Sequence, residues 1–293
     1  MKIKQTYRKS VFKEPVQMAA IMMLFIIGIV TFPTRIILGW FYKGDNEFVF
    51  LLADGVERLL FCVLMVYFAL QFGFRLWPKQ FNAIAYLAVL PALIISINNF
   101  PFVSYFSGNC SVEAKFFEIA SFTLWCVGVG LFEEIAFRGV IFPLVLIKIK
   151  KIKSPKWAFL QRRPVFWTIA FSGGIFALTH LVNLFGGNIG GTFLQVGYTF
   201  LIGSMCGIIV AKTGNVFYAA AAHVIYNFCG MLVEYCGSGT MWTTPQVICT
   251  AVVGVIVGAY LVAVAFLSDR DPRSAYGMLG NDDEFTAELL KVA

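Results

Sequence analysis

The sequence predicts an all-α membrane protein: a bundle of about eight transmembrane helices with a polar cavity inside it. Three observations lead to this fold class. The 293 residues are 59% hydrophobic and only 13% charged, whereas about a quarter of a soluble domain is charged. Apolar stretches near the roughly 20 residues that a helix needs to cross a hydrocarbon core recur along the chain. Basic residues gather in alternate connections between these stretches.

Eight apolar stretches form the predicted spans, flanked by a basic N-terminal segment at residues 1–15 and an acidic C-terminal tail at residues 268–293. The transmembrane domain therefore extends over residues 16–267. The fourth stretch is too long for one straight crossing, and we expect a break near Val127–Glu134, "VGVGLFEE". The predicted spans are Val16–Trp40, Phe48–Phe72, Phe81–Phe100, Phe116–Ile149, Val165–Leu184, Thr192–Ala211, Val216–Tyr235 and Thr243–Leu267.

Lys and Arg residues set the predicted orientation. They concentrate in the N-terminal segment and in the connections after the second, fourth, sixth and eighth spans, whereas the other connections hold little beyond Lys43. Because such residues favour cytoplasmic loops, both termini are predicted to be cytoplasmic. Topology thus explains the net charge of +7. The lipid bilayer is the expected environment, and no nucleic-acid partner is predicted.

Three charged residues lie inside the fourth span, in "LFEEIAFRGVIFP". A charged side chain at the centre of a bilayer costs about 2.5–3.5 kcal/mol on insertion scales. Glu134 and Arg138 are four residues apart, share one face of a helix and can neutralise each other. Glu133 is rotated by about 100° from that face. It therefore needs a partner on another helix.

The only two histidines of the chain also lie within predicted spans. His180 ends "FALTH", four residues after Phe176, and His223 begins "HVIYN", four residues before Asn227. His223 and Asn227 project from one helix face. A lone buried histidine is usually a packing residue, but ionisable groups in a membrane usually face a polar cavity and mark function. Together with Glu133, these side chains predict one shared site.

This set of side chains fits peptide-bond hydrolysis without a protein nucleophile. A carboxylate and an imidazole placed together can deprotonate water and return the proton to a leaving amine. A second imidazole with an amide N–H can stabilise the oxyanion that forms when water attacks a carbonyl. By pairing with Glu134, Arg138 is expected to keep the Glu134 carboxyl ionised and to hold Glu133 in the correct orientation.

A zinc site made from Glu133, His180 and His223 is a chemical alternative. The chain lacks the H-E-x-x-H pattern of a zinc-binding protease helix. Because Asn227 lies beside His223 as a hydrogen-bond donor, we favour the metal-free site and expect no cofactor.

Three motifs resemble those of the CPBP family of CAAX prenyl endopeptidases, bacteriocin-processing and self-immunity proteins, also called Abi proteins. "EEIAFRG" is similar to E-E-x-x-x-R, "FALTH" to F-x-x-x-H and "HVIYN" to H-x-x-x-N/D. They occur in order over about Leu131–Gly230, within a motif core of about residues 116–235. The resemblance implies a multi-helix endopeptidase of a bacterial plasma membrane that cuts a membrane-presented peptide or precursor.

The resemblance also implies roles for the motif residues. Glu133 and His180 are expected to activate the water, and His223 and Asn227 to form the oxyanion site. Glu134, Arg138 and Phe176 are expected to support them. The alternatives are a non-catalytic bacteriocin-immunity or scaffold protein and, third, a transporter with a proton relay through Glu133 and the histidines.

Two further expectations concern residues outside these motifs. Asp54 and Arg58 in the second span are four residues apart and are expected to form a self-contained ion pair. Cys110 and Cys236 fall in predicted external connections, where a disulfide between them is conceivable. Scattered free thiols are the favoured interpretation, because no C-x-x-C spacing occurs.

Overall fold

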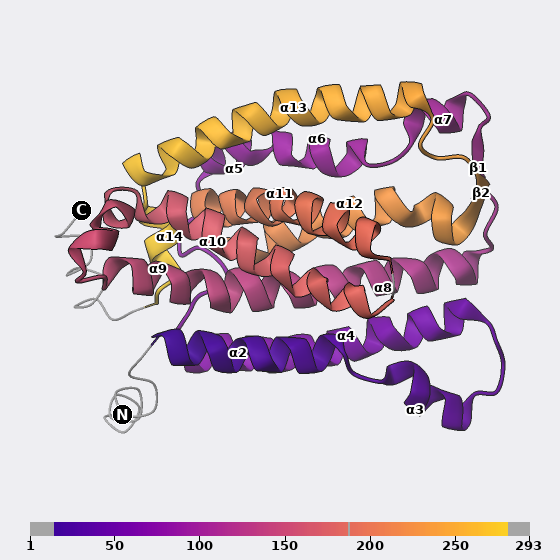
Figure 1. The fold of residues 1–293 in the computed structure, drawn as a ribbon, viewed down its shortest axis with the longest axis horizontal. Helices are drawn as coiled ribbons and strands as arrows, with labels where there is room; N and C mark the ends of the chain where they lie inside the picture. Colours follow the sequence, from indigo (N-terminus) through magenta and orange to yellow (C-terminus); the bar gives the residue numbers. More distant parts are fainter. Residues whose placement is uncertain (1–14, 187, 281–293) are drawn as a thin grey trace.

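A computed structural model gives the fold of the protein and describes residues 15–186 and 188–280. Long helices lie roughly along one common axis, and short elements close the two ends of the bundle (Figure 1). The helices are α2 (Pro15–Val30), α3 (Thr34–Phe41), α4 (Glu47–Gln71), α5 (Ala83–Val89), α6 (Pro91–Asn98), α7 (Phe102–Phe106), α8 (Phe116–Glu134), α9 (Phe142–Lys150), α10 (Pro164–Thr179), α11 (Ile189–Thr213), α12 (Val216–Cys236), α13 (Thr244–Leu267) and α14 (Arg273–Gly277). The strands β1 (Cys110–Val112) and β2 (Gly237–Gly239) pair antiparallel, and 3-10 turns cover Pro155–Arg162, His180–Gly186 and Ser268–Arg270.

The predicted all-α membrane fold is confirmed. Each of the eight predicted spans is helical over most of its length. Five helical segments of the described chain are long and apolar enough to cross a membrane by themselves, and these are Gln17–Phe41, Pro164–Gly186, Ile189–Thr213, Val216–Cys236 and Thr244–Arg270.

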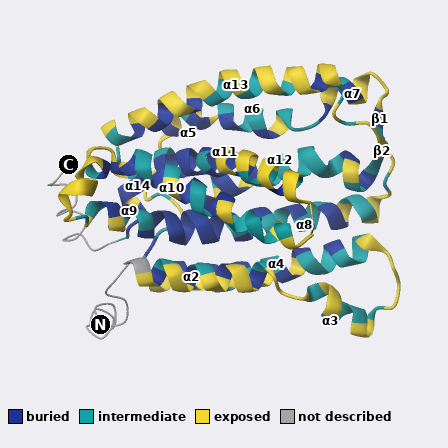
Figure 2. Ribbon diagram, in the orientation of Figure 1, coloured by how far each residue is buried: buried dark blue, intermediate teal, exposed yellow. Residues whose placement is uncertain are grey.

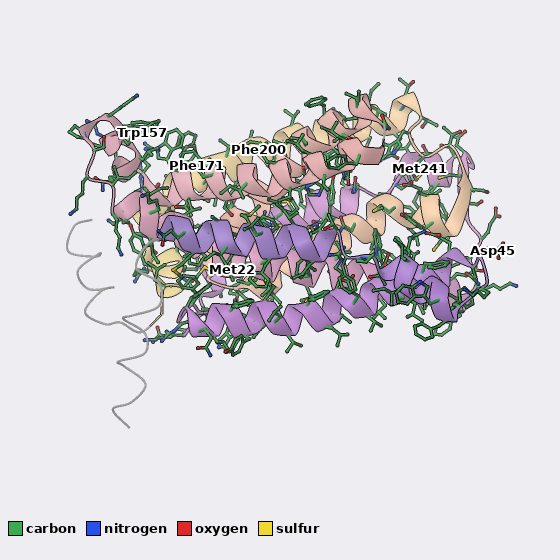
Figure 3. The ribbon with its side chains drawn as sticks, turned by 60° about the horizontal axis from the view of Figure 1, so that its bottom comes forward. Met22, Asp45, Trp157, Phe171, Phe200 and Met241 are labelled. Atoms are coloured by element: carbon green, nitrogen blue, oxygen red, sulfur yellow. The ribbon has the colours of Figure 1, made fainter. Side chains whose placement is uncertain are left out.

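Burial separates an inner layer from an outer one. Buried residues gather on α8 to α12, whereas the outward faces of α2 and α13 are exposed (Figure 2). Apolar side chains such as Phe171 and Phe200 project from the outer surface of the bundle (Figure 3). Large exposed apolar faces around an interior that encloses the charged Glu134 and Arg138 are what a bundle in lipid requires, because only the interior can hold polar groups.

A break was expected near Val127–Glu134, and an irregular turn directly follows this segment. α8 is continuous to Glu134, and a π-helical turn over Ile135–Ile141 leads into α9. The glycines of this segment allow close helix packing instead. A Cβ atom on Gly128 would lie 2.5 Å from the carbonyl oxygen of Gly55 on α4. π-helical turns inside α-helices are frequent at functional sites, and this one directly follows the paired glutamates.

The two ends of the bundle differ in structure. At one end β1 and β2 pair beside α7 (Figure 1). Cys110 and Cys236 near these strands are buried free thiols, and no disulfide joins them. At the other end α14, within the predicted tail, packs on the bundle with Ala275 and Tyr276 buried. The acidic residues after Gly280 and the basic N-terminal residues lie outside the described ranges.

Candidate active site

A cavity of about 360 Å³ lies within the helix bundle, between α4, α8, α11, α12 and the end of α10. The four predicted catalytic residues, Glu133, His180, His223 and Asn227, all line it. Phe176 also lines it. The sequence motifs, which are up to about 95 residues apart in the chain, thus meet at one place because α8, α10 and α12 pack around a common space. Their catalytic roles stay predictions.

Glu134 and Arg138 lie behind the cavity wall and are completely buried. As predicted, they form an ion pair, with Arg138 Nη1 donating to Glu134 Oε1 over 2.9 Å. Arg138 Nη2 also donates to the Gly203 carbonyl of α11 over 2.6 Å. Buried charges are tolerated when they are paired and hydrogen-bonded. The pair therefore ties α8 to α11 at membrane depth.

The same carboxylate oxygen fixes His223 on α12. His223 Nδ1 lies 2.8 Å from Glu134 Oε1, and an ionised carboxylate only accepts hydrogen bonds. Nδ1 must therefore carry the proton, and the Nε2 atom of His223 is left for the cavity. The sequence did not predict this contact, because it assigned Arg138 as the only partner of Glu134.

His180 is oriented in a similar way from the end of α10. Its Nδ1 lies 3.1 Å from the carbonyl oxygen of Phe176. A carbonyl only accepts, so Nδ1 donates and Nε2 carries the lone pair. Both histidines thus use Nδ1 as an anchor and keep Nε2 for a water molecule or a substrate.

The Phe176 ring packs between the charged pair and the two imidazoles. The guanidinium carbon of Arg138 lies 4.7 Å from the ring centroid, within the range of a cation–π contact. The rings of His180 and His223 meet it edge-on, with centroids 5.0 and 5.9 Å away. This packing restricts the orientation of both imidazole rings.

Glu133 lines the cavity. Its side chain is 18% exposed, and its Oε2 lies 3.7 Å from His223 Nε2. That distance is too long for a direct hydrogen bond. Among the described residues, the nearest basic group on another helix is thus His223, while His180, with which Glu133 is predicted to act, lines the same cavity. Glu133 is not committed to a strong contact and remains available to a water molecule.

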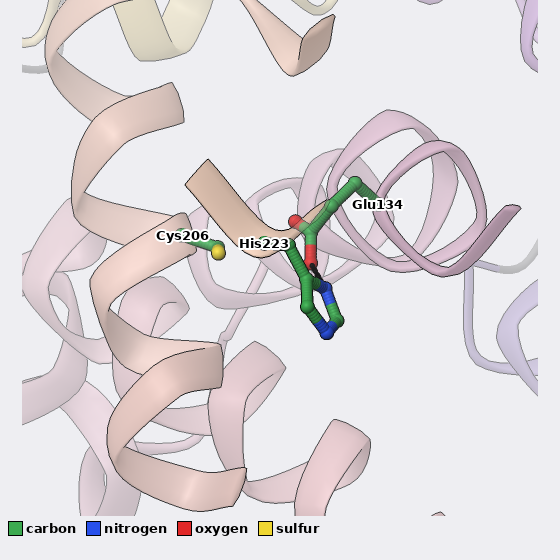
Figure 4. A group of neighbouring side chains, drawn as sticks. All are labelled: Glu134, Cys206 and His223. Carbon is green, nitrogen blue, oxygen red and sulfur yellow. Dashed lines mark hydrogen bonds and ion pairs between the residues drawn. The ribbon is translucent and has the colours of Figure 1, made fainter. Parts of the chain in front are cut away.

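Glu134, His223 and Cys206 form a group whose polar atoms lie within 4.8 Å of one another (Figure 4). Their residue types are those of metal ligands. However, Glu134 Oε1 already accepts from Arg138 and from His223. A metal ion would be repelled by the guanidinium beside it, so we interpret the group as a hydrogen-bond network. Cys206 could not be predicted as a member of this group, because nothing in its spacing links it to the motifs.

The predicted Asp54–Arg58 ion pair on α4 is wrong. Arg58 Nε approaches Glu57 Oε2 instead, at 3.7 Å, and its Nη2 donates to the Val30 carbonyl over 3.4 Å. The guanidinium lies over the Phe132 ring of α8, with its carbon 5.5 Å from the centroid. Packing of α8 on α4 therefore directs the side chain away from Asp54.

Asp54 and Arg58 nevertheless line the same cavity as the predicted catalytic residues. An amide pair that the sequence analysis missed lines it too, with Asn183 Nδ2 donating to Gln195 Oε1 over 2.8 Å. Both amides lie in otherwise apolar segments of the sequence. A lone polar residue in such a segment was the signal that could have predicted their place in the cavity lining.

Residues 115–229 match a family model described as Rce1-like, type II CAAX prenyl endopeptidase. This segment covers less than half of the chain and contains all three motifs. The match confirms the family resemblance that the motifs predict. Comparisons with curated proteins and with solved structures gave no match.

Proposed function

Since residues 115–229 match a family of CAAX prenyl endopeptidases, we propose that this protein is an intramembrane endopeptidase that hydrolyses a peptide bond of a membrane-presented peptide or precursor. The observation that carries the proposal is that Glu133, His180, His223 and Asn227 line one cavity inside the bundle. They supply an acid, two imidazoles and an amide, which suffice for hydrolysis by an activated water molecule.

Glu133 and His180 act on the water. The water oxygen attacks the scissile carbonyl carbon while Glu133 takes one of its protons, and the carbonyl electron pair moves onto oxygen. His180 Nε2, left as an acceptor by the anchored Nδ1, holds the same water in place. Glu133 then gives its proton to the leaving nitrogen as the C–N bond breaks. The two new ends of the peptide are a carboxyl group and an amine.

His223 and Asn227 stabilise the oxyanion. Asn227 donates through its side-chain amide, and His223 through Nε2–H. Because Nδ1 of His223 already donates to Glu134, donation from Nε2 requires a protonated ring. Glu134 and Arg138 thus serve as positioning residues and do not touch the substrate.

A zinc-dependent version uses the same cavity. A histidine that ligates a metal usually donates its other ring nitrogen to a carboxylate or carbonyl, and both histidines have such an anchor. Glu133, His180 and His223 would then be the ligands. We favour the metal-free version because Asn227 provides a second oxyanion donor. The zinc-dependent version would replace the metal-free one if the purified protein contained stoichiometric metal, lost activity to a chelator and regained it with zinc.

The test uses purified protein in proteoliposomes and internally quenched peptides ending in C-a-a-X, with and without a prenyl group. We expect Glu133→Gln to reduce kcat by at least about 10³-fold, in the range lost with a general acid–base group. Its matched control is Glu234→Gln, which makes the same change on an exposed glutamate of α12 and should keep activity.

Equal activity of the two variants would contradict the proposal. Binding of the peptides without cleavage by the unmodified protein would support the immunity or scaffold alternative. Solute uptake driven by a pH gradient would support the transporter.

A further inference from the structure

A second cavity, of about 770 Å³, lies at the end of the bundle opposite the β1–β2 pair. Its walls are the connection between α4 and α5, the turn between α11 and α12, and the α14 region. The ends of several long helices meet here (Figure 1), so the cavity lies at the level where the bundle leaves the hydrocarbon core. The proposed peptidase activity does not use it.

The wall formed by the α4–α5 connection is fixed by backbone hydrogen bonds. Arg75 N donates to the Met278 carbonyl over 2.8 Å, and Val216 N donates to the Leu76 carbonyl over 2.9 Å. Phe74 and Leu76 are buried in the core, whereas Arg75 and Trp77 line the cavity. The connection is therefore a rigid wall, and the cavity is formed before any ligand arrives.

The charged side chains in the lining are mostly basic. Arg75, Lys79 and Arg273 line the cavity, and Asp271 is the one acid among the described lining residues. Asp271 is held by Arg273 in a two-point contact, with distances of 2.7 and 2.8 Å. Because this pair carries no net charge, the positive charge of the lining comes from Arg75 and Lys79. The cavity is suited to an anion such as a phosphate group.

The rim of the same cavity is apolar and aromatic. Trp77 is 55% exposed and Phe81 74% exposed. Trp77 stacks on Phe217 at the start of α12, with ring centroids 6.2 Å apart. Trp and other amphipathic rings at helix ends mark the membrane–water interface. A soluble anion would gain nothing from this rim, whereas an amphiphile would cover it.

We propose that this cavity binds the phosphate headgroup of an anionic phospholipid. Lys79 contacts the phosphate, Arg75 adds positive potential, and the glycerol and first acyl carbons lie over Trp77 and Phe81. Basic pockets between transmembrane helices bind anionic headgroups by this combination of charge and apolar contact. The site is separate from the active-site cavity, because the two share no lining residue.

The test measures binding of brominated lipids by quenching of tryptophan fluorescence in the full chain. Brominated phosphatidylglycerol should quench more strongly than brominated phosphatidylcholine, and Trp77→Phe should remove the difference. Lys79→Gln should weaken phosphatidylglycerol binding about five-fold, as for the loss of one lysine near an anionic surface. The matched control is Lys153→Gln, an exposed lysine of the α9–α10 connection outside the cavity, which should change nothing.

Three results would overturn the proposal. The first is equal quenching by the two lipids, and the second is equal loss in the Lys79 and Lys153 variants, since both indicate a diffuse charge effect. The third is selectivity that arises only after removal of residues 281–293, since the acidic tail would then be the occupant. Inorganic phosphate separates the two sources of the anion: displacement of the brominated lipid by phosphate alone would mean a free-phosphate site, whereas no displacement supports the lipid.

Discussion

Glu133 and Glu134 are neighbours in the chain but lie in opposite environments. The Glu134 side chain is fully buried and accepts hydrogen bonds from Arg138 and His223. Glu133 is 18% exposed to the cavity and has no contact closer than 3.7 Å to a basic group among the described residues. The two side chains point in different directions, because each residue of an α-helix is rotated by about 100° from the one before it. One acid is thus held in the buried network, whereas the other faces the cavity, which agrees with the catalytic role that we propose for Glu133.

The largest effect on the free energy of unfolding is expected for a substitution of Arg138. Arg138→Met leaves Glu134 buried without its cation, and breaking a buried pair in this way costs about 3–5 kcal/mol of the free energy of unfolding. Unfolding in a mixed-micelle titration measures it. The matched control is Arg58→Met on α4, where the nearest acid lies 3.7 Å away and a smaller loss is expected.

The double variant Glu134→Leu with Arg138→Met sharpens the same comparison. Replacing both partners of a buried pair by apolar groups is often neutral, so stability should largely return. Activity should not, because His223 loses the acceptor at Nδ1. Full activity in the double variant would contradict the positioning role of Glu134.

The next prediction concerns Asn227, the proposed oxyanion donor. Removal of one oxyanion donor reduces kcat by about 10²–10³-fold in other hydrolases, and we expect Asn227→Ala to fall in this range. Asn227 lines the cavity and is half-buried, so the unfolding transition should change little. A rise in KM at unchanged kcat would instead assign Asn227 to substrate binding.

Cys206 gives the smallest expected effect. Its thiol lies near Glu134 and His223 (Figure 4), but Cys206 does not line the cavity. Cys206→Ala should reduce stability by about 0.5–1.5 kcal/mol, as for the loss of one buried methyl-sized group, and should keep kcat. Loss of a bound metal together with activity would show that our interpretation of this group as a hydrogen-bond network is wrong.

Much of this arrangement followed from the sequence. Apolar length and basic connections predicted the helices, and the i,i+4 spacing predicted the Glu134–Arg138 pair. The contact between Glu134 and His223 was missed, because it depends on how α12 packs on α8. The Asp54–Arg58 prediction failed for the same kind of reason, since the Phe132 ring of the neighbouring helix redirects the arginine. The spacing of residues in the sequence predicts which side chains share one face of a helix. The packing of neighbouring helices decides which partners those side chains contact.

The most direct test of the account is a double-mutant cycle between Glu133 and His180, because the central claim is that both act on one water molecule. We predict that Glu133→Gln and His180→Ala each reduce kcat strongly. Residues that work as a unit are non-additive, so the double variant should be hardly worse than Glu133→Gln alone. Losses that multiply in the double variant would mean that the two side chains act independently and would contradict the account.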